Sequence, residues 1–223
     1  MGIILPQKTD KDRKTVHYNL VDSKNLLLIF TRNPELGKCK TRLAASVGDE
    51  TALEIYKFLL DHTVNITSNL NVAKQVYYSV KIRENDLWDD LVYDKKLQVG
   101  NDLGKRMAYA FQEGFASGFE KICIIGSDMY DLSQKDIELA FSKLESHDFV
   151  IGPALDGGYY LLGMKALHPK IFKDKDWGKD TVLEDTLTDL ENHNVHLLET
   201  RNDVDVYEDI KDISAFKPFL KHL

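Results

Sequence analysis

Short apolar runs alternate with amphipathic stretches along most of the chain. Residues 26–30 form a continuous apolar run that stops before Pro34 and Gly37, which predicts a strand buried on both faces of a parallel sheet. Within residues 48–70, apolar side chains recur every three or four positions and predict a helix with one face on that sheet. The same criteria predict strands at residues 76–80, 97–99, 122–125, 149–151, 159–164 and 195–198, and helices at residues 102–115, 133–145, 181–192 and 207–221.

Strands and helices thus follow one another in turn, and this order predicts an α/β protein with three α/β/α layers and a mostly parallel central sheet. A chain of 223 residues is long enough for one large domain or two small ones. No linker-like segment, low-complexity segment or internal repeat divides it. We expect a single domain at residues 24–223, preceded by a loosely ordered leader at residues 1–23, which are polar and aperiodic.

The charge balance narrows the possible partners. The sequence has 29 Lys and Arg against 36 Asp and Glu, a net charge of −7, which argues against binding to nucleic acid or to an anionic membrane surface. The longest apolar run, residues 26–30, is too short to span a membrane. Cys39 and Cys123 are too few for a disulfide framework, and the N-terminus lacks a signal-peptide pattern, so we expect free thiols and a cytoplasmic location.

A basic loop follows the first predicted strand. Open α/β sheets bind ligands at the carboxyl ends of their strands, so cations here suit the phosphate groups of a ligand. Arginine offers a forked donor and lysine a compact charge. The alternative is a solvated basic loop with no ligand, and the loop matches neither a Walker A motif nor a GxGxxG dinucleotide motif. Its cations are Arg32, Lys38, Lys40 and Arg42.

The predicted strand at residues 122–125 leads directly into Gly126, Ser127 and Asp128. A carboxylate at this edge suits Mg²⁺, which takes oxygen ligands and commonly combines one or two carboxylates with substrate phosphates. The alternative is that Asp128 only caps a turn. A second acidic group, Asp203 and Asp205, follows the strand predicted at residues 195–198, and of these two we favour Asp205 as a second metal ligand.

Two glycine-containing segments are further candidates. In residues 152–160, glycines let the backbone approach a ligand, and Asp156 is placed to orient an acceptor, although an Asp-Gly hairpin explains the same residues. Residues 98–107 lie at a strand-to-helix junction, where exposed N–H groups attract anions or the edge of a base; Lys105 and Arg106 are otherwise ordinary helix-surface charges. No histidine pair has metal-ligand spacing, and no GxSxG or Cys/His pattern supports a nucleophilic hydrolase.

Together these segments resemble a bacterial family of nucleotide-diphospho-sugar transferase-like proteins with the glycosyltransferase A fold, often called radical-SAM/selenodomain-associated transferases. The resemblance runs from about Leu26 to Asp209. Five sequence blocks in the family's order identify the family more specifically than any single block would. The blocks are Gly37-x-x-Lys40-Thr41-Arg42-Leu43, Gln98-x-Gly100-x-Asp102-Leu103-Gly104-x-Arg106-Met107, Gly126-Ser127-Asp128, Gly152-Pro153-Ala154-x-Asp156-Gly157-Gly158-Tyr159-Tyr160 and residues 177–182.

The resemblance implies a nucleotide or nucleotide sugar at the first loop, a Mg²⁺ or Mn²⁺ ion at Asp128 with Asp205, and an unidentified small-molecule acceptor. The chain is also distantly similar to molybdenum-cofactor and 2-phospho-lactate guanylyltransferases. It departs from the family pattern at Leu36 and Tyr130, where proline is usual, and Tyr130 is a candidate for narrowing the pocket. The resemblance implies that a nucleotide or phosphate is bound by Arg32, Lys38, Lys40, Thr41, Arg42, Gln98, Gly100, Leu103, Gly104, Arg106 and Ser127. It implies that the acceptor is bound by Asp156, Gly157, Gly158 and Tyr159. The implied catalytic residues are Asp128, Lys40 and Asp156.

Three functions remain open at this point. The family resemblance favours glycosyl transfer from a nucleotide sugar. A first loop rich in cations favours nucleotidyl transfer from a nucleoside triphosphate with release of pyrophosphate, because a triphosphate carries more negative charge. A third possibility is a nucleotide-binding protein of the same fold without turnover.

Overall fold

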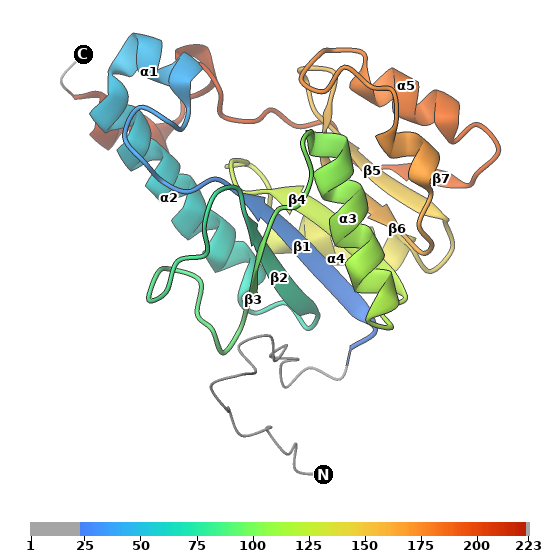
Figure 1. Ribbon diagram of the computed structural model, residues 1–223. Coiled ribbons are helices and arrows are strands. Elements are labelled where there is room, and N and C mark those ends of the chain that lie inside the picture. Colours follow the sequence, from blue (N-terminus) through green and yellow to red (C-terminus); the bar gives the residue numbers. More distant parts are fainter. Residues whose placement is uncertain (1–22, 222–223) are drawn as a thin grey trace.

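The computed structural model describes residues 23–221, so the leader expected at residues 1–23 lies almost entirely outside the described residues. Within that range, seven strands form one sheet in the order β3-β2-β1-β4-β6-β5-β7 (Figure 1). All neighbouring strands are parallel except β6, which is antiparallel to both β4 and β5. The strands are β1 (Asn25–Thr31), β2 (Ala73–Tyr78), β3 (Asp94–Leu97), β4 (Lys121–Gly126), β5 (Phe149–Pro153), β6 (Tyr159–Met164) and β7 (Val195–Leu197).

Helices cover both faces of the sheet, which confirms the expected α/β/α architecture (Figure 1). The helices are α1 (Thr41–Val47), α2 (Asp49–Thr67), α3 (Leu103–Ala116), α4 (Gln134–Lys143) and α5 (Val182–Asp189). Three 3₁₀ helices complete the described chain: η1 (Pro169–Phe172), η2 (Tyr207–Asp209) and η3 (Ser214–Leu220). None of the helices in residues 23–221 is long and apolar enough to cross a membrane.

The apolar run of β1 divides between the two faces because successive side chains of a strand point in opposite directions. Leu27 and Ile29 belong to the core beneath α2 and α4, whereas Leu26 and Leu28 belong to the core beneath α3. All four are fully buried. A strand covered on both faces has no polar side, which explains why its sequence is a continuous apolar run and not an alternating one.

A third core joins the C-terminal segment to the first two helices. Val204, Ile210 and Phe216 pack against Leu43 of α1 and Ile55 of α2, and all five are buried. This packing carries residues 203–205 back across the molecule toward the ends of β1 and β4.

Two predicted features require correction. The helix expected at residues 207–221 is wrong, because the segment forms the short helices η2 and η3 with Pro218 inside the second. Proline lacks the N–H needed to continue an α-helical hydrogen-bond ladder. In addition, Thr41 and Arg42, the last residues of the predicted basic loop, are the first residues of α1, and Lys40 directly before them has left-handed backbone angles of φ 50° and ψ 45°.

Several local predictions are confirmed. Ser133 and Asp136 form a reciprocal capping box at the start of α4, as their spacing predicts. Cys39 and Cys123 are free and buried thiols. The predicted strand at residues 76–80 lies slightly earlier, as β2, and β3 is likewise displaced toward the N-terminus.

Candidate active-site cleft

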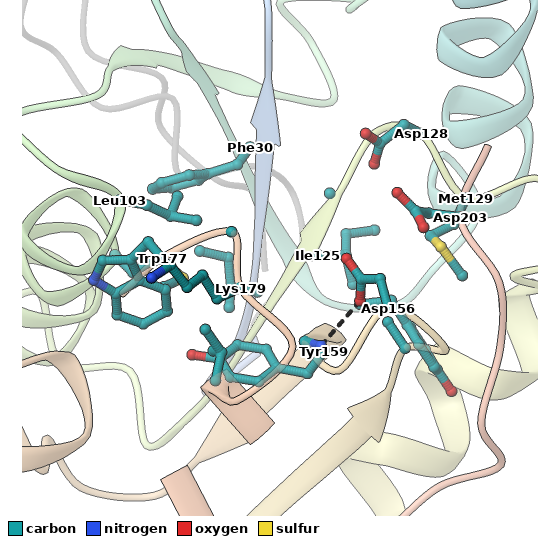
Figure 2. A pocket seen from close by; sticks show the side chains of 18 residues that line it. Phe30, Leu103, Ile125, Asp128, Met129, Asp156, Tyr159, Trp177, Lys179 and Asp203 are labelled. Carbon is teal, nitrogen blue, oxygen red and sulfur yellow. Dashed lines mark hydrogen bonds between the residues drawn. The ribbon is translucent and has the colours of Figure 1, made fainter. Parts of the chain in front are cut away.

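A cleft of about 240 Å³ opens at the carboxyl ends of β1 and β4 (Figure 2). Its walls come from the end of β1, the start of α3, the loops after β4 and β5, and the loop before α5. The cleft has two chemically different ends. Figure 2 shows Asp128, Asp156 and Asp203 on one side, facing Phe30, Leu103 and Trp177 on the other.

Asp128 and Asp203 meet at the acidic end because of a backbone contact. The N–H of Val204 donates to the carbonyl oxygen of Asp128 at 3.3 Å, which attaches the C-terminal segment to the end of β4. Val204 itself is buried, with 2% of its surface exposed. The residues on either side of it therefore diverge: Asp203 lines the cleft, whereas Asp205 pairs with Arg42 at 2.5 Å.

The Asp203 carboxyl lies in an unfavourable place for a negative charge. Burial and then the charge of Asp128 raise its pKa to about 6. No hydrogen bond or ion pair to another residue of the described chain holds the Asp203 side chain. It is a partly buried carboxylate that faces a second carboxylate, which is a favourable arrangement only with a cation nearby.

Lys40 supplies one such cation. Its Nζ lies 2.9 Å from Asp128 Oδ2, and only 7% of the Lys40 side chain is exposed. Burial alone would lower the pKa of Lys40, but the Asp128 carboxylate outweighs it and the net shift of the pKa is upward. Asp203 and Asp205 act in the same direction, so the ammonium group is near all three carboxylates.

Buried hydroxyl groups connect the strand ends below this ion pair. The Tyr56 hydroxyl of α2 lies 3.3 Å from Thr31 Oγ1 and 3.2 Å from Ser127 Oγ, and it accepts the N–H of Arg32 at 2.9 Å. Ser127 also donates to Thr31 at 3.1 Å. The hydroxyl of Ser127 is thus used inside the protein, between β1 and β4, and the residue is buried and does not line the cleft.

The opposite end of the cleft is mainly apolar, although Lys179 also lines the cleft. Trp177 contacts Tyr159 edge to face, with ring centroids 6.5 Å apart. The indole lies so close to α3 that a Cβ on Gly104 would be 2.5 Å from Trp177 Nε1, which explains the glycine there. Burial raises the pKa of Tyr159, so this phenol stays protonated. Flat aromatic walls of this kind accommodate a planar or sugar ring.

The glycine-rich segment expected to bind an acceptor forms the floor between the two ends. Asp156 lines the cleft, and its Oδ1 accepts the N–H of Gly158 at 2.9 Å. Gly157 faces away, toward the loop before α5, where its carbonyl oxygen accepts the N–H of Leu183 at 2.9 Å. Gly158 and Tyr159 line the cleft.

The other cations of the first loop lie outside the cleft lining. Lys38 is exposed and pairs with Glu35 at 2.9 Å, and the Arg42 side chain is 73% exposed in its pair with Asp205. Arg32 is exposed, and Thr41 opens α1 at the surface. Lys40 alone among the expected phosphate-binding cations reaches an acid of the cleft.

Most of the predicted binding residues in the block at residues 98–107 hold the fold together, and one of them lines the cleft. Gln98 donates to the carbonyl oxygens of Thr31 and Tyr77 and accepts from Arg106 at 3.3 Å. Arg106 also donates to the carbonyl oxygen of Gly100 at 3.0 Å. These contacts brace the junction between β3 and α3. Leu103, 44% exposed, is the one predicted residue of this block that lines the cleft.

Sequence reasoning missed Trp177 and Asp203 as site residues. Trp177 lies in the last of the five blocks that carry the family resemblance, and Asp203 lies two residues before Asp205, the acid that the sequence analysis favours. The metal-ligand role expected for Asp205 stays a prediction. Tyr130 does not narrow the cleft, because its ring packs in the third core against Phe216, with centroids 5.0 Å apart.

Two features bear on whether a metal fits. Carboxylate oxygens are the ligands that Mg²⁺ and Mn²⁺ prefer, and Asp128 and Asp203 present them to the same end of the cleft. Residues 23–221 contain no ready-made group of three or more His, Cys, Asp or Glu able to hold a metal ion. The donor set fits an ion held by two carboxylates together with ligand phosphates and water, which is common for Mg²⁺.

Residues 63–179 match the model of a family described as an uncharacterized protein conserved in bacteria, DUF2064. The chain belongs to this family. No curated protein matches the chain. A crystal structure of a candidate nucleotide-diphospho-sugar transferase from Desulfovibrio desulfuricans G20 is 30% identical, aligns with 90% of this chain and 95% of the other, and has a TM-score of 0.78.

More distant structures share the fold alone. A 4-diphosphocytidyl-2C-methyl-D-erythritol synthase from Anaerococcus prevotii is 10% identical, covers 90% of this chain and 98% of its own, and has a TM-score of 0.57. A cytidylyltransferase from Leptospira borgpetersenii is 15% identical over 84% of this chain and 83% of its own, with a TM-score of 0.51. These neighbours are transferases, and they confirm the expected nucleotide-diphospho-sugar transferase fold.

Proposed function

We propose that the protein is a metal-dependent transferase that binds a nucleotide sugar in the cleft and transfers the sugar to a small-molecule acceptor. The observation that carries the proposal is the convergence of Asp128 and Asp203, from distant parts of the chain, opposite an aromatic wall. The relative from Desulfovibrio desulfuricans, described as a candidate nucleotide-diphospho-sugar transferase, supports the same reaction class.

Asp128 and Asp203 would hold Mg²⁺ or Mn²⁺ together with the phosphates of the ligand. When bound, such an ion supplies Lewis-acid stabilisation of the charge that develops on the departing phosphate. Three carboxylates, Asp128, Asp156 and Asp203, line the cleft. Two ammonium groups stand against them: Lys40 beside Asp128, and Lys179 in the cleft lining, which already pairs with Asp176 at 3.2 Å. The excess of negative charge favours an added cation and disfavours bare phosphate.

The chain's own residues would then position both substrates. Trp177 and Phe30 offer flat surfaces for a ring of the ligand, and Asp156 is placed to orient an acceptor hydroxyl. In glycosyl transfer, the acceptor oxygen bonds to the sugar carbon as the bond from that carbon to the phosphate oxygen breaks. Nucleoside diphosphate and a proton are released, and positioning by the cleft accounts for much of the catalysis.

Nucleotidyl transfer is the second candidate, because the fold is shared with the cytidylyltransferases above. The cation-rich first loop supported it in the sequence, but in the structure Lys38 and Arg42 pair with acids outside the cleft lining. A nucleotide-binding protein without turnover is the third.

Product analysis discriminates the three. We would incubate the full chain with a panel of nucleotide sugars and nucleoside triphosphates, mixed acceptors and Mn²⁺. Nucleoside diphosphate release supports glycosyl transfer, pyrophosphate release supports nucleotidyl transfer, and metal-dependent binding with no product supports the third reading. Absence of both turnover and metal-dependent nucleotide binding would refute both enzyme proposals.

Two variants connect the outcome to the cleft. Asp128→Asn and Asp203→Asn should each abolish metal-linked nucleotide binding, because each removes a charged ligand. Asp61→Asn is the matched control, since it removes the same charge from an exposed position on α2. Equal losses in all three variants would contradict a metal site between Asp128 and Asp203.

A further inference from the structure

The contact between Lys40 and Asp128 places an ammonium group on a proposed metal ligand. Lys40 Nζ is 2.9 Å from Asp128 Oδ2, and the two residues come from different loops of the chain. The Lys40 side chain is 7% exposed, compared with 38% for Asp128. The pair is therefore an interior contact at the edge of the cleft, not a surface ion pair that water and salt would largely screen.

We propose that Lys40 acts as a resident cation, which occupies Asp128 until the phosphates of a ligand draw it away, so that metal binding depends on the ligand. The proposal rests on the function proposed above, since it describes how the same metal site is controlled. It assigns Lys40 two partners in sequence, first the Asp128 carboxylate and then a phosphate oxygen of the ligand.

Competition at one carboxylate is the physical basis. The Asp128 carboxylate that Lys40 contacts would also hold the divalent ion of the proposed site. An ammonium group and a dication a few ångströms apart repel each other strongly, and more so in a partly buried place. Metal binding by the free protein must therefore displace Lys40 and leave its ammonium group buried without that partner.

A phosphate-bearing ligand removes this obstacle. Lysine has a flexible four-carbon stem with a compact charge at its end, so its ammonium group can move without the backbone. Neither of the other two nearby acids is free to receive it, because Asp203 is a ligand of the same proposed ion and Asp205 already pairs with Arg42. A phosphate placed between the metal and Lys40 gives both cations an anionic partner. Metal and ligand then strengthen each other's binding by the same factor.

Mn²⁺ titration of the full chain, followed by electron paramagnetic resonance of free Mn²⁺, tests the proposal without any turnover. In the absence of phosphate, Lys40→Gln should bind Mn²⁺ at least about fivefold more tightly than the native protein, because the competitor is gone. Lys40→Arg keeps the competing charge and should leave Mn²⁺ affinity close to native. Lys57→Gln removes one exposed charge from α2 and is the control for net charge.

Inorganic pyrophosphate is the probe for coupling, with Mn²⁺ bound by pyrophosphate alone measured in protein-free samples. Pyrophosphate should raise the Mn²⁺ affinity of the native protein several-fold and that of Lys40→Gln much less. Unchanged or weaker Mn²⁺ binding by Lys40→Gln would overturn the proposed exchange of Lys40 between Asp128 and a phosphate. The same increase in Mn²⁺ affinity in Lys57→Gln as in Lys40→Gln would also overturn it. Either result would leave the proposed function intact. No Mn²⁺ binding by any variant, with or without pyrophosphate, would overturn both.

Discussion

Gly157 is the position where one added methyl group should damage the cleft most. Its φ of +86° lies in the left-handed region that residues with a Cβ rarely adopt. A Cβ built there would also lie 2.1 Å from the carbonyl oxygen of Asp180 and 2.4 Å from its Cα. Both are backbone atoms, so no flexible side chain can yield to the new methyl group.

Two costs add in Gly157→Ala. The left-handed conformation costs roughly 1 kcal/mol for a residue with a Cβ, and overpacking typically costs about 1–3 kcal/mol. We therefore expect the free energy of unfolding to fall by about 2–4 kcal/mol, which is a Tm decrease of roughly 5–15 °C for a domain of this size. The loop before α5 must shift, and with it the bond from Leu183 to the Gly157 carbonyl.

The neighbouring glycine is a matched control. Gly158 lacks a left-handed φ, and the atom nearest to a Cβ there would be Oδ1 of the Asp156 side chain, at 3.2 Å. Gly158→Ala should cost less than about 1 kcal/mol. Urea unfolding followed by circular dichroism, with calorimetry for the Tm, measures both variants. Equal destabilisation of the two, or a loss below about 0.5 kcal/mol in Gly157→Ala, would refute the reasoning.

Two other predictions address the cleft wall and the acid side of stability. Trp177→Ala should weaken binding of the nucleotide found in the panel by about three- to tenfold, because stacking on an aromatic ring contributes roughly 0.5–1.5 kcal/mol. The variant should also lower Tm, since the indole packs against Tyr159 and α3. Calorimetric titration of the folded variant measures the affinity, and unchanged affinity would contradict a ring at that wall. Burial opposes the charge of Asp136, but hydrogen bonds from Ser133 and the guanidinium of Arg201 at 2.7 Å lower its pKa below the usual 3.8. Because the pKa of Asp136 is lower in the folded than in the unfolded protein, its carboxylate stabilises the fold at pH values above the unfolded pKa, and this contribution disappears as pH falls through the folded pKa. Asp136→Asn lacks the contribution and should therefore lose less stability than the native protein below about pH 4. Urea midpoints measured against pH test this, and equal slopes in the two proteins would contradict it.

The strands and helices of the two sheet-facing cores could be predicted because their signal is local. The run at residues 26–30 is apolar throughout since β1 is covered on both faces, and the spacing in α2 follows one buried stripe. The pair Ser133 and Asp136 likewise needs only a four-residue segment to form its capping box. The position of Asp128 at a sheet edge follows from the same local reasoning, because it comes directly after an apolar strand.

The choice between Asp203 and Asp205 could not be made from the sequence, since both flank the same valine. The third core separates the two acids: Val204 is buried against α1 and α2, so that Asp203 lines the cleft and Asp205 pairs with Arg42, while the metal-ligand role of either acid stays a prediction. The helix expected at residues 207–221 failed for a related reason, because this segment follows the surface it packs on and contains Pro218.

Sequence by itself determined the layers of this protein, the order of its elements and the chemical types gathered at one sheet edge. Tertiary structure decided which of those groups meet: Lys40 with Asp128, Arg42 with Asp205, and Trp177 opposite the acids. The physical reason is the distance along the chain over which each interaction acts. Backbone hydrogen bonding and apolar periodicity act over a few residues, whereas ion pairing and burial at the cleft join residues that only long-range packing brings together.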